Sequence, residues 1–548
     1  MELFNTLSGK IETLAPIGAP ELRMYCCGPT VYDYGHIGNF RTFLHVDVLR
    51  RFLLQLGIQV KHVMNITDVD DKIIRNAAAA QLPIGDYTAK FDKAFFEDLT
   101  ALNIQFPELI ARATECIPDM VSLIQQLAAK DIAYQTEDGS WYFRLARDPE
   151  YGKLSKKDLE NIEDGARVDV DEYEKDAARD FALWKAAKPG ETSWDTPLGT
   201  GRPGWHIECS AMATKFLGDS FDLHAGGEDL MFPHHENEIA QSECASGKTF
   251  ARHWMHVRFL LVEGKKMSKS EGNFYTLRDL LLKGYRASAI RFLLISVPYR
   301  NQMNFTIDSL TESTNAVDRL RTFHQRMLKG LSSIKGLSPV NKTVILSEVE
   351  GPAVALAVAR SLQTNPKTVI LSEVEGPAVG AATKPHSAAF PDGLDPAVAV
   401  ATAKAEADYT AALGNDLNTA QARAAIFDLL RVANAAADHG TLRAENATHI
   451  LHVLSLFDGV FSILEDRDAE HTRAALAWAE KEGRLDQASP ELLATLSFTD
   501  ADIEALVSER TQAKKTRNFA RADAIRNDLL TKGVLIEDSK DGVSWKRK

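Results

Sequence analysis

The chain has 548 residues, of which 45% are apolar and 25% are charged. At about 150 residues per domain, this length predicts three or four domains, and the composition excludes a wholly disordered or collagen-like chain. Five cysteines are too few for a disulfide scaffold. The first residues lack the basic patch and apolar run of a secretory signal, and no run of about 18 apolar residues occurs. We therefore expect a protein of the reducing cytoplasm that does not cross a membrane.

Charge is unevenly distributed along the chain. The net charge is −13, yet residues 510–548 contain eleven lysines and arginines against five acidic residues. Such a run is most often a solvated tail, and it also suits contact with nucleic acid. Charge alone leaves both interpretations open.

The N-terminal segment has the pattern of a βαβ unit. Apolar residues 22–27 predict a strand, residues 40–56 carry a broad apolar helical face that Gly57 ends, and residues 58–66 alternate as a second strand. This order implies a parallel pair joined by a crossover. Ligands of such sheets bind at the carboxyl ends of the strands, beside helix N-termini, where residues 32–39 lie.

The middle of the chain is mixed and the last part is helical. Residues 109–130 predict a helix, 133–144 a pair of strands, and the polar segment 148–188 an insertion with little core of its own. Glycine, proline and threonine in 189–204 predict a loop. From 305 onward the helical period predicts a bundle followed by a small terminal module.

One segment is repeated without change, at Lys342–Val354 and at Lys367–Val379. Two copies are too few for a solenoid, which needs about three or more repeats. We interpret 337–396 as a poorly ordered insert between two helices, with a functional peptide motif as the alternative.

Residues His36–Asn39 are a candidate phosphate site. The N–H groups at a helix start attract phosphate, Gly35 and Gly38 permit close approach to the backbone, and His36 can hydrogen-bond to an oxyanion. A histidine there is more often a cap or a packing residue, so these residues are weak evidence by themselves.

The loop 264–273, named the lysine loop from here on, is a second candidate phosphate site, because it follows the buried-strand pattern Phe259–Val262. Its lysines, among them Lys266 and Lys269, can hold a polyphosphate as point charges. A solvated basic loop is the common alternative.

Four residues are candidate zinc ligands: Cys27, Cys209, His234 and Glu238. The last two are four residues apart, which puts them on one face of a helix. The other separations match no compact zinc finger, so buried structural cysteines and a surface pair remain an alternative. Three further residues compete as ligands: Cys26, His224 and His235.

Taken together, these segments resemble the bacterial cysteinyl-tRNA synthetases, a family of class I aminoacyl-tRNA synthetases. The two ATP signatures of the family resemble Pro29–Asn39 and Lys266–Ser270. More specific matches cover nearly the whole chain outside the repeat insert: Met24–Gly28, Asn65–Lys72, Gly204–Met212, Gly226–Ser242, Asn415–Thr419 and Ala520–Arg526.

The resemblance implies an α/β Rossmann-like catalytic domain with a parallel sheet and an insertion, then an all-α helical bundle and a small C-terminal anticodon-binding module. The expected parts are a first Rossmann half at 1–110, a connective insertion at 111–200, a second Rossmann half with the lysine loop at 201–304, a bundle at 305–470 interrupted by 337–396, and the terminal module at 471–548.

The resemblance also implies a cysteine–tRNA ligase that acts as a monomer. It would activate L-cysteine with ATP and Mg²⁺, and transfer it to the 3′-terminal adenosine of tRNA-Cys. One Zn²⁺ per chain would bind Cys27, Cys209, His234 and Glu238, and the substrate thiolate would join them. Zinc favours a thiolate over the hydroxyl of serine, so no editing domain is needed.

Roles follow residue by residue from the resemblance. The catalytic set is His36, Asn39, Lys266 and Lys269, and the ATP-binding set adds Gly38 and Gly227. The amino-acid pocket resembles Thr67, Trp205 and Asp229, with Asp229 toward the α-ammonium. Asn39 stands where the family usually has histidine, and we expect Asn39→His to keep or raise the activation rate.

Two alternatives share these features. The cysteine ligase of mycothiol synthesis resembles the same core but joins cysteine to an amino-sugar and lacks a tRNA-binding end. A zinc- and tRNA-binding protein with an inactive core is the second. The helical part and the basic end favour tRNA, where Phe519 and Trp545 are candidates for stacking on anticodon bases.

Overall fold

The computed structural model describes residues 1–18, 20–156, 180–332, 390–496, 500–531, 534–539 and 542–547. Most of the expected insert 337–396 and much of the polar segment 148–188 lie outside these residues. Within them, no helix combines the length and apolar character needed to cross a bilayer.

A parallel sheet forms the centre of the N-terminal part, in the strand order β12-β11-β3-β4-β5. Its strands are β3 (Glu21–Cys26), β4 (Gln59–Ile66), β5 (Leu109–Arg112), β11 (Phe221–Gly227) and β12 (Ala251–Val257). Each neighbouring pair is parallel. The chain moves outward from β3 to β5 and then returns to β11 on the other side of β3. This reversal creates the switch point at which ligands of such sheets bind.

The predicted βαβ unit is confirmed, with one shift at its helix. Helix α1 (Ile37–Gln55) joins β3 to β4 and begins three residues earlier than the apolar pattern predicts. The earlier start reflects the cap at His36, which brings Gly38 and Asn39 into the first turn.

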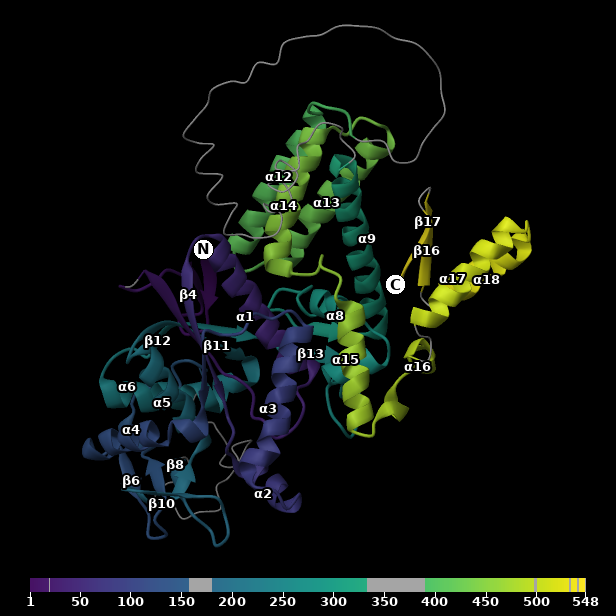
Figure 1. Cartoon of the computed structure of the whole chain (residues 1–548). Helices are drawn as coiled ribbons and strands as arrows, with labels where there is room; N and C mark the ends of the chain where they lie inside the picture. The colour runs from purple at the N-terminus through teal and green to yellow at the C-terminus, as the bar shows by residue number, and fades with distance from the viewer. Residues whose placement is uncertain are drawn as a thin grey trace.

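Helices cover both faces of the sheet (Figure 1). Helix α1 packs on one face, and α5 (Trp205–Leu217) packs on the other with α4 (Ile117–Ala129) and α6 (Glu236–Ser246) beside it. Two buried clusters follow from this arrangement, one on each face. Two further helices, α2 (Asp71–Ala79) and α3 (Ile84–Ala101), follow β4, and the hairpin of β1 (Glu2–Asn5) and β2 (Lys10–Thr13) lies along β12.

The insertion forms an antiparallel sheet in the order β6-β7-β8-β10-β9. Its strands are β6 (Ala133–Gln135), β7 (Trp141–Phe143), β8 (Phe181–Ala186), β9 (Trp194–Thr196) and β10 (Gly199–Pro203). The strand pair expected at 133–144 is confirmed.

Two expectations for this region are wrong. The predicted loop 189–204 contains β9 and β10, because part of it pairs as short strands. The helix predicted for 109–130 starts only at Ile117, because 109–112 pair with β4 as β5. The polar segment 148–188 was expected to have little core of its own, and its buried residues Leu183 and Trp184 belong to the large cluster on the α5 face of the parallel sheet.

A small sheet carries the lysine loop: β13 (Leu260–Val262), β14 (Lys265–Lys266) and β15 (Met303–Phe305), with α7 (Leu277–Leu282) and α8 (Ala287–Leu294) between the last two. The helical part then follows as α9 (Ile307–Ser332), α12 (Pro396–Gly414), α13 (Thr419–Asp438), α14 (Ala444–Phe461) and α15 (Asp468–Lys481). The expected boundaries after 110 and after 470 fall inside β5 and α15.

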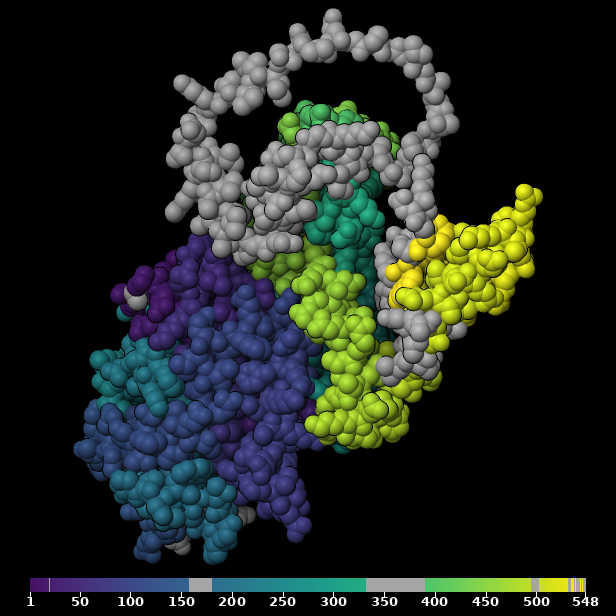
Figure 2. Space-filling model, viewed as in Figure 1, coloured from purple at the N-terminus to yellow at the C-terminus, as the bar shows by residue number. Residues whose placement is uncertain are grey.

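The terminal module stands apart from the main body (Figure 2). After α16 (Pro490–Leu496) it consists of α17 (Asp500–Lys515), α18 (Phe519–Thr531) and the hairpin of β16 (Val534–Ser539) and β17 (Gly542–Arg547). Its own small core contains Ile503, Ile525, Leu529 and Val534. The hairpin is an exception to the helical pattern expected after 305.

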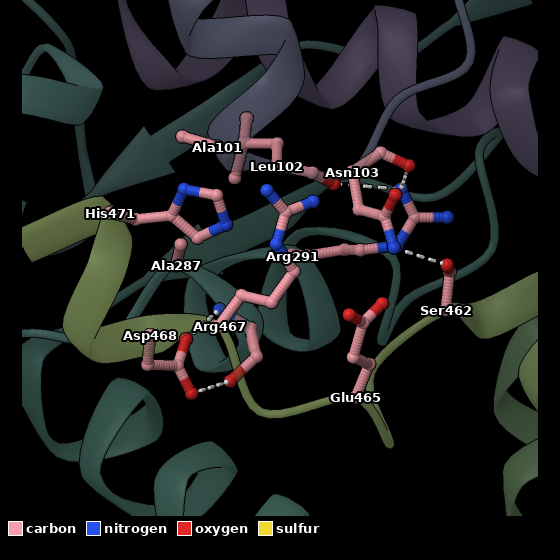
Figure 3. A pocket seen from close by; sticks show the side chains of 11 residues that line it. Ala101, Leu102, Asn103, Ala287, Arg291, Ser462, Glu465, Arg467, Asp468 and His471 are labelled. Atoms are coloured by element: carbon pink, nitrogen blue, oxygen red, sulfur yellow. Dashed lines mark hydrogen bonds between the residues drawn. The ribbon is translucent and has the colours of Figure 1, made fainter. Parts of the chain in front are cut away.

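A buried arginine ties the helical part to helix α1, which packs on the parallel sheet. Arg291 on α8 is 1% exposed and donates to Oδ2 of Asp47 on α1 at 2.6 Å. It also donates to the backbone oxygens of Leu102 and Phe461. A small pocket beside it is lined by polar residues that include Asp468 and His471 (Figure 3). None of the predicted site residues lines this pocket.

Candidate active site

The predicted metal ligands come together at the carboxyl ends of β3 and β11. Their donor atoms all lie within 4.8 Å of one another, and all four side chains are buried. The Sγ atoms of Cys27 and Cys209 are 3.8 Å apart, and Sγ of Cys27 is 3.7 Å from Oε1 of Glu238. That oxygen is 3.1 Å from Nε2 of His234. Two thiols, an imidazole and a carboxylate form a donor set that suits zinc.

Strand alternation separates the two neighbouring cysteines. Cys27 lies just beyond the end of β3 and joins the buried cluster on the face that α5 covers, where Cys209 also lies. Cys26 belongs to the cluster on the opposite face, against α1. Successive side chains of a strand point to opposite faces. The fold therefore turns Cys27, and not Cys26, toward the other donors.

A second set of four donors overlaps the first. It keeps the Cys27 thiol and the Glu238 carboxylate and replaces the other two ligands by His224 and His235. Nε2 of His224 is 2.8 Å from Oε2 of Glu238, and Nε2 of His235 is 3.4 Å from Sγ of Cys27. The competition between these histidines and the predicted set is thus present in the structure as well as in the sequence.

Two more histidines hold the candidate ligands in place. Nδ1 of His206 is 2.9 Å from Nδ1 of His234, and Nε2 of His256 is 2.8 Å from Nδ1 of His235. Burial lowers the pKa of His206 and of His256 to about 3, and it lowers the pKa of His234 and His235 well below the ordinary value. The rings are therefore neutral, as metal ligands must be.

Among the described residues, the carboxylate of Glu238 has no lysine or arginine as a partner. Burial raises the pKa of the thiols of Cys27 and Cys209, and the nearby Glu238 carboxylate acts in the same direction. Glu238 is fully buried. Burying an uncompensated carboxylate is costly. A divalent cation would compensate it, so the donor set fits zinc.

His36 caps α1 at the switch point. Its Nδ1 accepts from the backbone N–H of Asn39 at 3.1 Å, and Oδ1 of Asn39 accepts from the backbone N–H of His36 at the same distance. Burial lowers the pKa of His36, and the charge of Asp229 opposes this effect. A Cβ on Gly38 would press on the His36 ring, so a glycine is needed beside it.

The lysine loop lies against the start of α1. The N–H of Ile37 donates to the oxygen of Tyr275 at 3.0 Å, and the ring of Phe274 meets the His36 ring edge to face at 5.4 Å. Nζ of Lys269 is 2.5 Å from Oδ2 of Asp33, which raises the pKa of this lysine. Lys266 is exposed on β14. The two segments predicted to bind phosphate are thus adjacent in space.

Two of the residues predicted for the amino-acid pocket, Thr67 and Trp205, lie beside the candidate metal ligands. Oγ1 of Thr67 donates to Oε2 of the buried Glu208 at 2.8 Å. Trp205 is 41% exposed, and its ring centroid lies 4.3 Å from that of His234. One wall of this region is therefore an aromatic face beside a candidate metal ligand.

Asp229 and Gly227 lie at the end of β11. Asp229 is exposed in the short helix η4 (Glu228–Leu230), and a Cβ on Gly227 would collide with its carboxylate. The negative charge of Asp229 raises the pKa of His36 against the effect of burial, so this carboxylate lies near the His36 ring. An exposed carboxylate at this place can pair with an ammonium group.

Three residues of the site were missed by the sequence patterns: His206, Glu208 and His256. None has a spacing that marks a ligand or a base. For His206 and Glu208 the available signal was the density of polar residues in the family-like segment 204–212, on a largely buried helix. His256 lies in β12, outside the family-like segments, and no sequence pattern marked it.

Three family models match the chain. The class I (C) tRNA synthetase catalytic domain matches residues 13–315, the DALR domain 408–465, and the cysteinyl-tRNA ligase anticodon binding domain 499–545.

Relatives match along the whole chain. Proteins named cysteine–tRNA ligase from Koribacter versatilis and Solibacter usitatus are 52% and 46% identical, each over 100% of this chain and 100% of their own. One from Leptospira interrogans serovar Lai is 39% identical over 100% of this chain and 99% of its own.

Among solved structures, the methionyl-tRNA synthetase of Mycobacterium tuberculosis in complex with methionyl-adenylate is similar in fold. It is 16% identical, with a TM-score of 0.50, and the match covers 86% of this chain and 95% of that one. The Rossmann-like fold predicted from the sequence is thereby confirmed. The family models and the full-length relatives together show that this chain belongs to the cysteine–tRNA ligase family of class I aminoacyl-tRNA synthetases.

Proposed function

We propose that the chain is the ligase that joins L-cysteine to tRNA-Cys in two steps. The cysteine carboxylate attacks the α-phosphate of ATP and pyrophosphate leaves. A hydroxyl of the 3′-terminal adenosine then attacks the activated carbonyl and AMP leaves. The observation that carries this proposal is the juxtaposition, at one switch point, of a buried cluster of candidate zinc ligands with the two segments predicted to bind phosphate. Catalysis of both steps relies on positioning and on neutralising charge.

The metal cluster would select the substrate. Cys27, Cys209, His234 and Glu238 would hold one Zn²⁺, which supplies a soft acceptor for the thiolate of cysteine and not for the hydroxyl of serine. The neutral His234 ring and the buried Glu238 carboxylate support this set. His206 orients His234 through the contact between their Nδ1 atoms.

ATP would lie between the start of α1 and the lysine loop. His36 and the N-terminal backbone of α1 face the nucleotide from one side, and Lys266 and Lys269 approach its phosphates from the other. In the free chain Asp33 holds Lys269 at 2.5 Å. The phosphates, accompanied by Mg²⁺, would compete with this carboxylate for the ammonium group. Asp229 would pair with the α-ammonium of cysteine.

The helical part and the terminal module would bind tRNA. Not all of the basic excess is available, because Arg510 is buried and pairs with Asp538 at 2.7 Å. Trp545 packs against the small core of the module, which disfavours it as a stacking residue. Phe519 is 61% exposed at the start of α18, which supports it as the stacking candidate.

We further propose that the enzyme is a cytoplasmic monomer, as the resemblance implies. The decisive test of the function is transfer of labelled cysteine to total bacterial tRNA with ATP, Mg²⁺ and zinc-replete protein. Base-labile labelled tRNA is the expected result. Cysteine-dependent pyrophosphate release without labelled tRNA would favour the amino-sugar ligase. Binding of tRNA with neither reaction would favour an inactive core.

A further inference from the structure

The end of α15 touches the loop of the first ATP signature. Nε1 of Trp478 donates to the phenol oxygen of Tyr34 at 3.3 Å, and the two rings meet edge to face with centroids 5.2 Å apart. Tyr34 lies two residues before His36, whereas Trp478 belongs to the helical part, 444 positions along the chain from Tyr34. In Figure 1, α15 stands alongside α3, and Lys90 of α3 pairs with Glu482 just beyond α15 at 2.5 Å.

Arg278 brings the second ATP segment to the same contact. It lies on α7, which directly follows the lysine loop, and it is 3% exposed. Its guanidinium carbon is 4.8 Å from the ring centroid of Trp478 and 5.6 Å from that of Tyr34. Asp98 on α3 holds it at 2.9 Å. A buried guanidinium over two aromatic rings is an attractive arrangement.

The two ATP segments are also bound to each other. Thr276, the cap of α7, forms an antiparallel bridge with His36, and the N–H of Ile37 donates to Tyr275. A shift of Tyr34 or of Arg278 would therefore move the start of α1 and the base of the lysine loop together. Trp478, from the helical part, contacts both Tyr34 and Arg278.

We propose that Trp478 is a positioning residue for ATP. Acting through Tyr34 and Arg278, it fixes the relative placement of the two ATP-binding segments, so that the helical part influences the first step, which uses no tRNA. This inference rests on the proposed function, because it assumes that these segments bind ATP. A role limited to packing α15 would affect stability without a selective effect on ATP.

The test is cysteine-dependent exchange of pyrophosphate into ATP, measured without tRNA. Trp478→Ala is expected to raise the KM for ATP by about five-fold or more, because small displacements of binding groups are costly, and to leave the KM for cysteine within about two-fold. Trp478→Phe keeps a ring against Arg278 and should recover most of the affinity. Tyr34→Phe removes only the hydrogen-bond acceptor and should have a smaller effect than Trp478→Ala.

Leu476→Ala is the matched control, because Leu476 lies on the same helix and is buried in the large core cluster. It loosens α15 without removing the indole. An unchanged KM for ATP in folded Trp478→Ala, or an equal rise in Leu476→Ala, would overturn the inference. If Trp478→Ala fails to fold, the KM for ATP is measured in Tyr34→Leu instead. An unchanged KM in that variant, or an equal rise in Leu476→Ala, would overturn the inference. A wild-type enzyme without any exchange activity would instead refute the proposed function.

Discussion

The side chains and backbones of His36 and Asn39 hold each other in a reciprocal cap at the start of α1. Each side chain accepts a hydrogen bond from the other residue's backbone N–H at 3.1 Å. The asparagine that departs from the usual family histidine thus has a structural task, since it satisfies the first backbone donor of the helix. The cap also fixes the orientation of the His36 ring.

Two replacements of Asn39 distinguish its role as a helix cap from the effect of a negative charge at this position. Asn39→Ala should lower the free energy of unfolding by about 1 kcal/mol, because a capping acceptor is lost. Asn39→Asp should keep the cap and the stability but slow pyrophosphate exchange, since its carboxylate repels the phosphates of ATP. Thermal unfolding measures the change in stability, and pyrophosphate exchange on the same preparations measures the change in activation rate. Equal exchange rates for Asn39→Asp and wild type would contradict a phosphate site here.

Asn39→His is expected to keep or raise the activation rate, because an imidazole nitrogen can still accept from the backbone N–H of His36. Pyrophosphate exchange under saturating cysteine measures this rate. A ten-fold loss, which corresponds to roughly 1.4 kcal/mol, would show that position 39 needs its amide.

The zinc content of single variants tests the ligand set. Cys27→Ser should lose bound zinc, whereas its neighbour Cys26→Ser should retain one zinc per chain, because Cys26 lies on the other face of the sheet. His234→Ala should lose zinc and His224→Ala should retain it. Elemental analysis of purified protein provides the measurement. Loss in His224→Ala with retention in His234→Ala would assign the metal to the second donor set.

Lys269 and Lys265 form a matched pair for the lysine loop. Both are exposed and both pair with a carboxylate, Asp33 at 2.5 Å and Glu271 at 3.4 Å respectively. Lys269→Ala should slow pyrophosphate exchange by at least about ten-fold, or roughly 1.4 kcal/mol in the transition state. Lys265→Ala should stay close to wild type. Similar losses in both would mean that overall positive charge, and not a specific contact, matters.

Asp468 gives a prediction about pH and stability. Burial would raise its pKa, but the charge of Arg321 and the hydrogen bonds from Ser288 outweigh burial and lower it below the ordinary value of 3.8. Figure 3 shows this carboxylate at the edge of the small pocket. Because the folded-state pKa is lower, the stability it contributes is fully present above pH 4 or so and is lost as the pH falls through the folded pKa.

Asp468→Asn should therefore lower the free energy of unfolding by about 2 kcal/mol near neutral pH, since charged hydrogen bonds are lost. The difference from wild type should shrink only as the pH falls through the folded-state pKa, which lies below 3.8, because the wild-type carboxyl is then also protonated. Urea unfolding of both proteins, near neutral pH and at a pH below 3.8, measures this difference in the free energy of unfolding. If the stability difference between wild type and Asp468→Asn does not change with pH, the negative charge of Asp468 is not what stabilises its contacts with Ser288 and Arg321.

Local patterns predicted those parts of the fold that depend on neighbouring residues. The β3–α1–β4 unit follows from apolar periodicity within 45 or so positions. The strands β9 and β10 were not predicted, because the glycines and prolines of this segment are typical of a loop. Their pairing depends on the partner strand that contains Trp184. Strand pairing across such distances depends on tertiary contacts that no local pattern records.

In the candidate site, too, some features follow from local sequence and others depend on tertiary contacts. The candidate ligands were proposed from their residue types and from the resemblance, but the preference for Cys27 over Cys26 gains support from the direction in which the strand end points each side chain. The roles of His206 and His256 needed the packing of η5 (Met231–His235) against the sheet. Contacts such as that between Trp478 and Tyr34 join residues too far apart for any spacing rule.

Selection of cysteine by the buried metal cluster is measured by acylation of tRNA with labelled cysteine and, in parallel, with labelled serine. Zinc-replete enzyme is expected to esterify cysteine to tRNA and to discriminate against serine by about 10⁴-fold or more, because a bound zinc would select the sulfur of the substrate. Comparable charging with serine would contradict selection by the cluster of Cys27, Cys209, His234 and Glu238. Failure to charge tRNA with cysteine would contradict the assigned function itself.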